Sequence, residues 1–294
     1  MAWQQLRLQV QSGTIDFLEQ QLLEQGAVSV TYLDAKDQPV FQKEPGSTPL
    51  WDESILLSLF EADADLHDLL EWLQQNPAIL NRHTLKIDIL EDQAWERACM
   101  DDFHAMQFGE RLWICPSWQE PPNPSAVNII LDPGLAFGSG SHPTTGMCLT
   151  WLDGMDLQEK LVIDYGCGSG ILALASALLG AARVIGVDND PQALVATRDN
   201  AERNHIAEQD LLTFLPQAVP ALQADILLAN ILAEPLIELA SHFATLVKPG
   251  GQLVLSGLLS EQASAVLSAY TPWFEMQAPF EQQQWVRLSG RRKS

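Results

Sequence analysis

Hydrophobic and polar positions divide the chain into two patterns of strands and helices. In the first ninety residues, short apolar runs predict the order strand, helix, strand, strand, helix, strand. The predicted strands are 3–10, 27–32, 55–60 and 83–90, and the predicted helices are 14–25 and 64–74. This order is that of a ferredoxin-like α+β domain, with Thr14 as a helix N-cap and Gly26 as a helix-ending glycine.

From residue 127 onward, strands and helices alternate along the chain. Such alternation predicts a mostly parallel sheet with helices on both faces, as in Rossmann-like α/β domains. The last two strands, around 274–277 and 284–289, have no helix between them. We therefore expect them to form an antiparallel pair at one edge of the sheet.

The segment between the two patterns has a different character. Residues 92–106 are helical in pattern, and residues 111–115 form a short strand. Three prolines in the next segment exclude both helix and strand pairing there. The sequence thus predicts three parts: a ferredoxin-like domain at 1–91, a connector at 92–126 and an α/β domain at 127–294.

Composition sets the broad class of the protein. The chain has 294 residues, and 47% of them are hydrophobic, which is enough for two cores. No apolar run reaches the ~18 residues of a membrane span, and the start lacks the pattern of a signal peptide. Cytoplasmic location is therefore expected. No cysteine pair has the C-x-x-C spacing, so neither a zinc site nor a disulfide framework is predicted.

The charge of the chain is strongly negative, at −22. The first hundred residues hold 17 acidic and 6 basic residues, a net charge of −11 on a third of the chain. A surface of this kind repels phosphate backbones and attracts basic partners. The alternative is that the charge serves solubility alone.

One turn contains the main candidate chemistry. An apolar strand ends in Asp164-Tyr165-Gly166-Cys167-Gly168-Ser169-Gly170, and an apolar helix follows. Alternate glycines let a ligand approach the backbone. A second apolar strand ends at Asp188, whose carboxylate can accept both hydroxyls of a ribose. This combination indicates a nucleoside-binding βαβ unit, and the lack of Lys or Arg near the turn favours a ligand without phosphates. A simple tight turn is the alternative.

Two further segments add candidate residues. Residues 131–145 form a glycine-rich loop with Phe137, and the helix start at Pro143 can accept a carboxylate at its unpaired N–H groups. An ordinary linker is the alternative for this loop. His142 is not assigned as a general base, because a histidine before a helix-starting proline more often caps or packs.

Asn230 ends a third buried strand, where α/β sheets place their ligands. Its side-chain oxygen can accept hydrogen bonds from an amine without the charge that would hold the amine as an ammonium. The alternative is that Asn230 caps the next helix.

These motifs resemble known methyltransferases. The glycine turn, Asp188 and the Lys-Pro-Gly-Gly at 248–251 are similar to those of class I S-adenosylmethionine-dependent methyltransferases. The segments FGSGSHPTT at 137–145, VIDYGCGSG at 162–170 and ANILAEPL at 229–236 resemble, over the full length, the ribosomal protein methyltransferase family. That family trimethylates amino groups of large-subunit ribosomal protein eleven.

The resemblance implies a cofactor, a substrate and a set of site residues. S-adenosylmethionine would contact Thr145, Gly166, Gly168, Asp188 and Asn230, and Asn230 would also lie beside the acceptor amine. The acidic N-terminal domain would bind the basic ribosomal protein, with lysine ε-amines and the N-terminal α-amine as acceptors. The resemblance implies no metal, and no direct contact with nucleic acid or membrane.

Two other functions are consistent with parts of the sequence. An RNA methyltransferase would share the cofactor motifs, but the net charge of −11 over the first hundred residues leaves no basic stripe for RNA. A non-catalytic S-adenosylmethionine-binding factor would need no acceptor site such as the Asn230 segment. Methyl transfer to a ribosomal protein is therefore the leading hypothesis.

Overall fold

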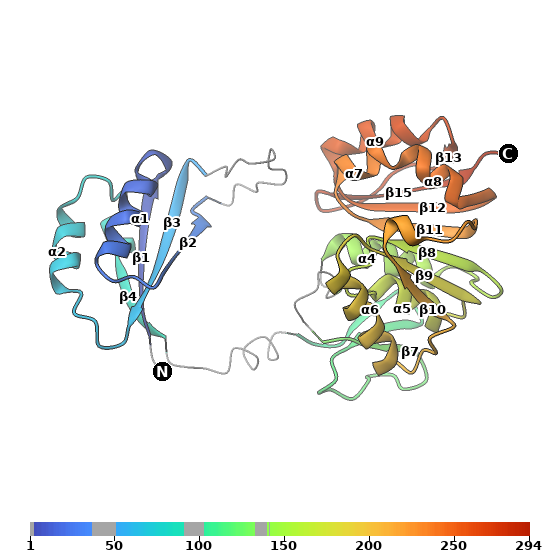
Figure 1. The fold of residues 1–294 in the computed structure, drawn as a ribbon, viewed down its shortest axis with the longest axis horizontal. Coiled ribbons are helices and arrows are strands. Elements are labelled where there is room, and N and C mark those ends of the chain that lie inside the picture. The colour runs from blue at the N-terminus through green and yellow to red at the C-terminus, as the bar shows by residue number, and fades with distance from the viewer. Residues whose placement is uncertain (1–2, 37–50, 91–102, 133–139, 141) are drawn as a thin grey trace. The chain divides into compact units, whose positions relative to one another are not determined.

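The computed structural model describes residues 3–36, 51–90, 103–132, 140 and 142–294. The chain divides into two compact units, Met1–Ala98 and Cys99–Ser294 (Figure 1). Separate clusters of buried side chains form the core of the first unit and the two core layers of the second.

The first unit is a four-stranded sheet with two helices. Its elements are β1 (Trp3–Gln11), α1 (Ile15–Glu24), β2 (Ser29–Asp34), β3 (Glu53–Glu61), α2 (His67–Gln75) and β4 (Lys86–Leu90). The strand order is β2-β3-β1-β4, and every neighbouring pair is antiparallel. This is the ferredoxin-like topology, as the order of elements predicted.

Alternation of side chains explains how this sheet packs. Leu6, Leu8 and Val10 of β1 are fully buried, whereas Arg7 between them is exposed. Helices α1 and α2 cover the buried face with residues three and four positions apart. Their buried side chains are Ile15, Leu18 and Leu22 of α1 and Leu69 and Leu73 of α2.

The ends of these helices differ in detail from the prediction. Thr14 occupies the N-cap position of α1, but its hydroxyl donates to the carbonyl of Gln11 at 2.8 Å instead of accepting from the helix. Gly26 has a φ of +94°, the left-handed conformation expected after a helix end. Helix α2 begins at His67 and not at residue 64, because Asp65 Oδ1 accepts from the His67 N–H at 3.0 Å in a turn before the helix.

The second unit has a large sheet at its centre. Its order is β10-β9-β8-β11-β12-β15-β13, with β14 paired to β15. The five strands β10, β9, β8, β11 and β12 run parallel to one another, and β15 is antiparallel to β12. The strands are β8 (Leu161–Tyr165), β9 (Arg183–Val187), β10 (Leu211–Phe214), β11 (Ala224–Asn230), β12 (Val247–Leu259), β13 (Phe274–Met276), β14 (Phe280–Gln282) and β15 (Trp285–Arg292). This arrangement is the Rossmann-like class I methyltransferase sheet.

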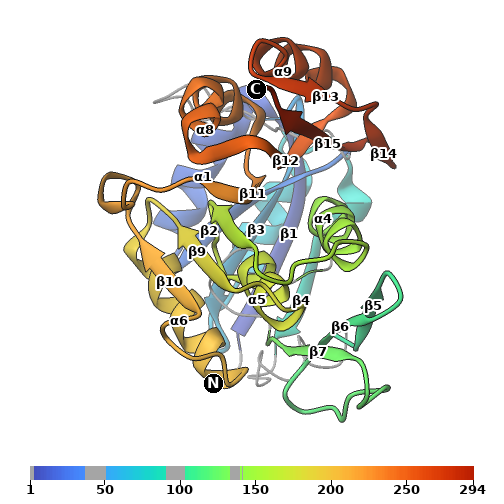
Figure 2. The same ribbon diagram turned by 90° about the vertical axis from the view of Figure 1, so that its right-hand side faces the viewer.

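Helices cover both faces of this sheet. They are α4 (Pro143–Asp153), α5 (Ile171–Leu178), α6 (Pro191–Arg203), α7 (Ala233–Glu238), α8 (Ala240–Leu246) and α9 (Ala263–Tyr270). One core layer joins the sheet to α7, α8 and α9, and the other joins it to α4 and α5. Figures 1 and 2 show α8 and α9 on one side of the strands and α5 on the other.

The connector contributes strands to the second unit. β5 (Met106–Phe108) pairs with β6 (Leu112–Cys115), and β6 runs parallel to β7 (Val127–Ile130) in a small separate sheet. The predicted helix over 92–106 was wrong at its end, because Met106 starts a strand and residues 103–105 are not helical. Residues 92–102 of that prediction lie outside the described residues.

The C-terminal strands pair as predicted, but not both at the edge. β13 is antiparallel to β15, with Phe274 opposite Arg292. β15 lies inside the sheet, between β12 and β13. The prediction of an edge pair was therefore wrong for β15, because this strand also pairs with the distant strand β12 on its other side.

Candidate functional site

The strand order determines where the candidate site lies. β8 has β9, the next strand along the chain, as its neighbour on one side, and β11 as its neighbour on the other side. At such a switch point the loops beyond the carboxyl ends of the strands diverge and leave space for a ligand. The glycine turn follows β8, Asp188 follows β9, and Asn230 ends β11.

The glycine turn presents its backbone at two positions. Gly166 and Gly168 have φ values of +81° and +54°, which favour glycine. The N–H groups of Gly166 and Cys167 donate to the carbonyl of Val187 at 2.6 and 3.0 Å and so fix the turn to β9. Cys167 and Ser169 are buried, whereas Gly166 and Gly168 are only half-buried. The turn therefore exposes backbone and buries side chains.

Two of the three glycines also serve packing within the protein. A Cβ atom on Gly166 would lie 2.2 Å from Cγ2 of Ile231, the residue after Asn230. A Cβ atom on Gly170 would lie 2.8 Å from Cγ2 of Thr197 on α6. The missing side chains thus make room for Ile231 at Gly166 and for Thr197 of α6 at Gly170.

Asp188 holds the turn from the neighbouring strand. Its Oδ2 accepts from the Gly168 N–H at 2.9 Å, and its Oδ1 accepts from the Asp190 N–H at 3.0 Å. The residue is half-buried. Each carboxylate oxygen has a further lone pair, so the group remains able to accept hydrogen bonds from a ligand.

A second carboxyl lies under the turn. Asp164 is 2% exposed, and its Oδ2 accepts from the Ala173 N–H of α5 at 3.0 Å. Burial raises the pKa of Asp164 to about 7, the hydrogen bond from Ala173 opposes this, and the charge of Asp188 adds to the rise. Asp164 thus links β8 to α5 beneath the turn.

Thr145 and Asn230 come together across the sheet end. Asn230 Nδ2 donates to Thr145 Oγ1 at 3.2 Å, although the two residues are 85 positions apart. Thr145 lies in the first turn of α4 and is 3% exposed, and Asn230 is half-buried. Asn230 does not cap α7, since the N-cap of that helix is Leu232. The alternative interpretation of Asn230 as a helix cap was therefore wrong.

His142 has a structural role. It is the N-cap of α4, and its Nδ1 accepts from the Thr144 N–H at 3.4 Å and lies 2.7 Å from Thr144 Oγ1. Its ring packs edge-on against Trp285 at 4.6 Å between centroids. Burial lowers the pKa of His142. These contacts confirm that it caps and packs.

Sequence reasoning missed Ile231 and Gly257, two residues that position the Asn230 segment. Gly257 has a φ of +86°, and a Cβ atom there would lie 2.4 Å from the carbonyl oxygen of Ile231. Gly257 sits where the pairing of β12 with β15 shifts register. A glycine inside an apolar strand was the available signal, because it often marks a close approach of another backbone. Ile231 is thus held between Gly166 and Gly257.

The structure therefore brings the predicted residues together as two contacting groups. Gly168 and Asp188 share a hydrogen bond, and so do Thr145 and Asn230. Ile231, next to Asn230, connects the groups by its contact with Gly166. The part of the glycine-rich loop that contains Phe137, Ser139 and Ser141 lies outside the described residues.

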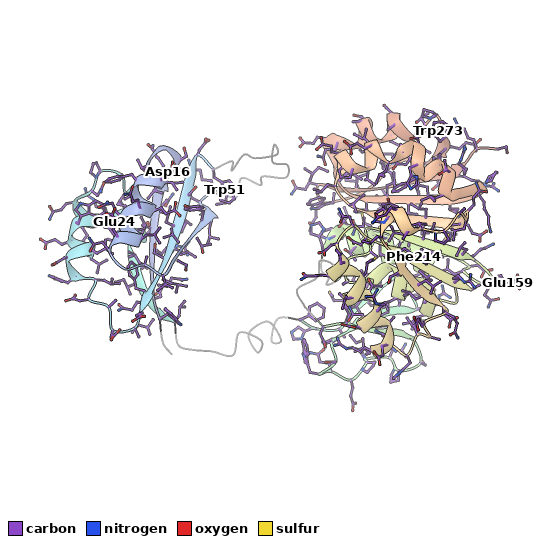
Figure 3. All side chains as sticks on the ribbon, in the orientation of Figure 1. Asp16, Glu24, Trp51, Glu159, Phe214 and Trp273 are labelled. Atoms are coloured by element: carbon purple, nitrogen blue, oxygen red, sulfur yellow. The ribbon has the colours of Figure 1, made fainter. Side chains whose placement is uncertain are left out.

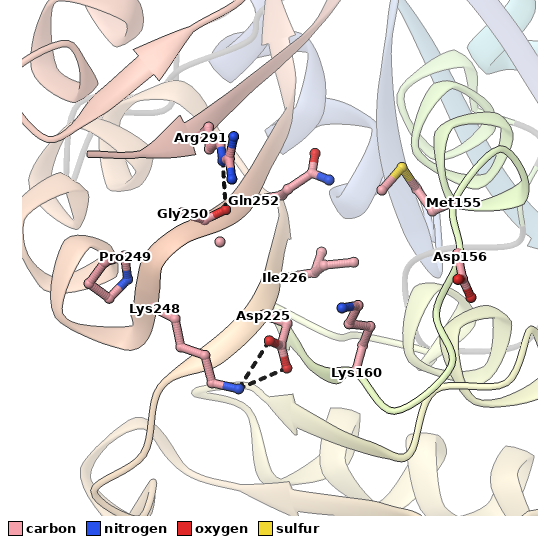
Figure 4. Close-up of a pocket in the computed structure, with 11 residues that line it drawn as sticks. Met155, Asp156, Lys160, Asp225, Ile226, Lys248, Pro249, Gly250, Gln252 and Arg291 are labelled. Atoms are coloured by element: carbon pink, nitrogen blue, oxygen red, sulfur yellow. Dashed lines mark hydrogen bonds and ion pairs between the residues drawn. The ribbon is translucent and has the colours of Figure 1, made fainter. Parts of the chain in front are cut away.

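The opposite end of the sheet has a hollow of about 220 Å³ (Figure 4). There Lys248 Nζ lies 3.0 Å from both carboxylate oxygens of Asp225, and Arg291 Nε donates to the Gly250 carbonyl at 2.9 Å. Burial alone would raise the pKa of Asp225, but the Leu161 N–H at 2.9 Å and the Lys248 ammonium outweigh it and lower the pKa. These pairs tie together the starts of β8 and β11 and the turn within β12.

The described ranges contain neither a cluster of metal-ligand side chains nor a membrane-spanning helix. Within them, no three His, Cys, Asp or Glu side chains gather as metal ligands would. In the same part of the chain, no helix is long and apolar enough to cross a bilayer. Cys115, Cys148 and Cys167 are buried free thiols.

Comparisons with known proteins agree over the whole chain. The sequence model of the family described as "Ribosomal protein L11 methyltransferase (PrmA)" matches residues 2–293. A protein of Marinobacter nauticus named ribosomal protein L11 methyltransferase is 53% identical, with 100% of this chain and 99% of the relative covered. A protein of Shewanella piezotolerans with the same name is 54% identical over 100% of both chains.

A solved structure is also similar. The crystal structure of a ribosomal protein L11 methylase from Lactobacillus delbrueckii subsp. bulgaricus has 31% sequence identity and a TM-score of 0.60. The match covers 65% of this chain and 100% of the solved chain.

Proposed function

Because the chain belongs to the ribosomal protein L11 methyltransferase family, we propose that it transfers methyl groups from S-adenosylmethionine to amino groups of large-subunit ribosomal protein L11. The acceptors are lysine ε-amines and the N-terminal α-amine. One structural observation supports this most directly: the Thr145–Asn230 pair lies next to the glycine turn that Asp188 holds. The cytoplasm, where ribosomal proteins meet modifying enzymes, is the proposed location.

The residues at the site fit S-adenosylmethionine. Gly166 and Gly168 offer bare backbone, and Asp188 offers a half-buried carboxylate for ribose hydroxyls. No lysine or arginine lies between residues 161 and 182, so the turn lacks the cations that a phosphate group would favour. When bound, the cofactor supplies a methyl group on an electrophilic sulfonium.

The protein must align the acceptor amine and keep it neutral. A free lysine has a pKa of about 10.4, so a neutral amine at pH 7 costs roughly 4–5 kcal/mol. Asn230 is uncharged, and its Nδ2 already donates to Thr145, which directs its Oδ1 away from that contact. This oxygen can accept from the amine and orient its lone pair, and it lacks the full negative charge by which a carboxylate would hold the amine as an ammonium. No general base is assigned.

Methyl transfer can be tested with purified components. The chain is incubated with labelled S-adenosylmethionine and either ribosomal protein L11 or ribosomal RNA. We expect intact-mass increments of one methyl group each on the protein and no label on the RNA. Labelled RNA with an unmodified protein would instead support an RNA methyltransferase. Cofactor binding without any transfer would support a non-catalytic factor.

Replacing Asp188 with alanine should weaken cofactor binding. The ribose hydroxyls lose a charged acceptor, worth about 1.5–3 kcal/mol for each hydrogen bond. Calorimetric titration with S-adenosylmethionine measures the change. The matched control is Asp190→Ala, which removes the N-cap contact to the Gln192 N–H at 2.8 Å but no proposed ligand contact. Equal affinities in the two variants would exclude Asp188 from the cofactor site.

We also propose that the first unit recognises the protein substrate. Removing residues 1–98 should leave a second unit that folds around its own core layers and still binds S-adenosylmethionine. Methyl transfer to ribosomal protein L11 should fall by at least about tenfold in kcat/KM, because substrate contacts are lost. Transfer at the intact rate would show that the first unit is not needed for recognition.

A further inference from the structure

The first unit exposes two aromatic rings on its helices. Phe17 of α1 is 55% exposed and Trp72 of α2 is 37% exposed. Their ring centroids lie 6.3 Å apart at an interplanar angle of 53°, so the two rings form one apolar patch. Exposed aromatic rings held on rigid helices are the side chains that most often anchor protein interfaces.

The helices that carry these rings are acidic. Asp16 precedes Phe17 on α1, and Asp68 lies one helical turn before Trp72 on α2; both carboxylates are exposed. Figure 3 shows Asp16 and Glu24 along α1. No lysine or arginine occurs in residues 8–35 or 51–81, which include both helices. We call the exposed surface of α1 and α2 the helix face.

The face of the first unit's sheet that the two helices leave uncovered carries positively charged side chains. Arg7 of β1 is paired with Lys86 of β4, and both side chains point away from the core that Leu6 and Leu8 enter. Lys36, after β2, lies 2.6 Å from Glu53 in an ion pair. Arg7, Lys86 and Lys36 thus lie on the sheet or next to it and not on the two helices, so the two faces of the unit differ in the charge that they offer a partner.

We propose that the helix face is the docking surface for the ribosomal protein substrate. The inference rests on the proposed function, which makes the partner a basic protein, since proteins that bind RNA carry lysine and arginine for its phosphates. An apolar side chain of that partner packs on Phe17 and Trp72. Basic side chains next to it pair with Asp16 and Asp68.

Steady-state methyl transfer by the full chain tests this assignment, with ribosomal protein L11 as the varied substrate. For the double variant Phe17→Ala, Trp72→Ala, we expect KM for the protein to rise at least about tenfold, with kcat unchanged. The matched control is Leu33→Ala, which removes a 40% exposed apolar side chain from β2. The control should keep the wild-type KM, and thermal unfolding verifies that each variant is folded.

A second double variant, Asp16→Asn with Asp68→Asn, tests the charges. Its KM should rise and should respond less to added salt than that of the wild type. Unchanged KM values in both double variants would overturn the inference, as would an equal rise in the Leu33→Ala control. Sedimentation of the wild type as a dimer, with the aromatic variant as a monomer, would also overturn it by showing that a second copy covers the face. A wild-type chain that methylates no ribosomal protein L11 would instead refute the proposed function itself.

Discussion

Replacing Asn230 with aspartate should reduce methyl transfer steeply at neutral pH while largely retaining cofactor binding. The change keeps the size of the side chain but adds a negative charge beside the acceptor amine. That charge raises the pKa of the amine by about 1–3 units, so the neutral fraction at pH 7 falls about tenfold for each unit. Transfer should therefore recover in part as the pH rises. Single-turnover rates measured against pH report this directly.

The control for this variant is Asn230→Ala. It removes the hydrogen bond to Thr145 Oγ1 at 3.2 Å and the amine acceptor, but it adds no charge. We expect a lower rate with a pH dependence parallel to that of the wild type. If the aspartate and alanine variants gave parallel profiles, Asn230 would not govern the protonation state of the amine.

Replacing Gly166 with alanine should impair both cofactor binding and methyl transfer, the latter by roughly 10²-fold. The new Cβ atom would lie 2.2 Å from Cγ2 of Ile231. Ile231 has little room to retreat, because its carbonyl oxygen already packs against Gly257. The clash therefore displaces the segment that carries Asn230. Single-turnover rates and calorimetric cofactor affinities measure the two effects.

Gly180→Ala separates this clash from backbone strain. Gly180 has a φ of +104°, but the nearest atom to an added Cβ is Cγ of Gln158, at 4.0 Å. Both variants should lose about 1–2 kcal/mol of unfolding free energy from the left-handed conformation. Only Gly166→Ala should lose activity. Equal activities of the two variants would mean that Ile231 does not transmit the substitution at Gly166 to Asn230.

Local patterns in the sequence predicted the fold well. The sequence shows apolar residues at alternate positions of one strand, and the structure buries three of them, Leu6, Leu8 and Val10. The sequence also shows the glycine turn between an apolar strand and an apolar helix. Both are short-range features that depend on neighbours within a few residues. They led to the ferredoxin-like order of the first unit and the α/β character of the second.

Contacts between distant segments were beyond those patterns. The packing of Gly170 on Thr197, and of Gly257 on Ile231, joins residues 26 or more positions apart. The interior place of β15 likewise follows from its pairing with β12 and not from its own composition. Such contacts are decided by which elements meet in the folded chain, so the constraint on Asn230 through Ile231 became apparent only in three dimensions.

The place of β15 between β12 and β13 has a consequence for synthesis of the protein on the ribosome. β13 leaves the ribosome before β15, yet its neighbour in the sheet is β15. Until β15 has emerged, β12 is an open edge with unpaired N–H and C=O groups, and such edges promote pairing with other chains. A nascent chain that stalls after β12 has emerged and before β15 has emerged would therefore be most prone to aggregate, with the strands around the site already exposed.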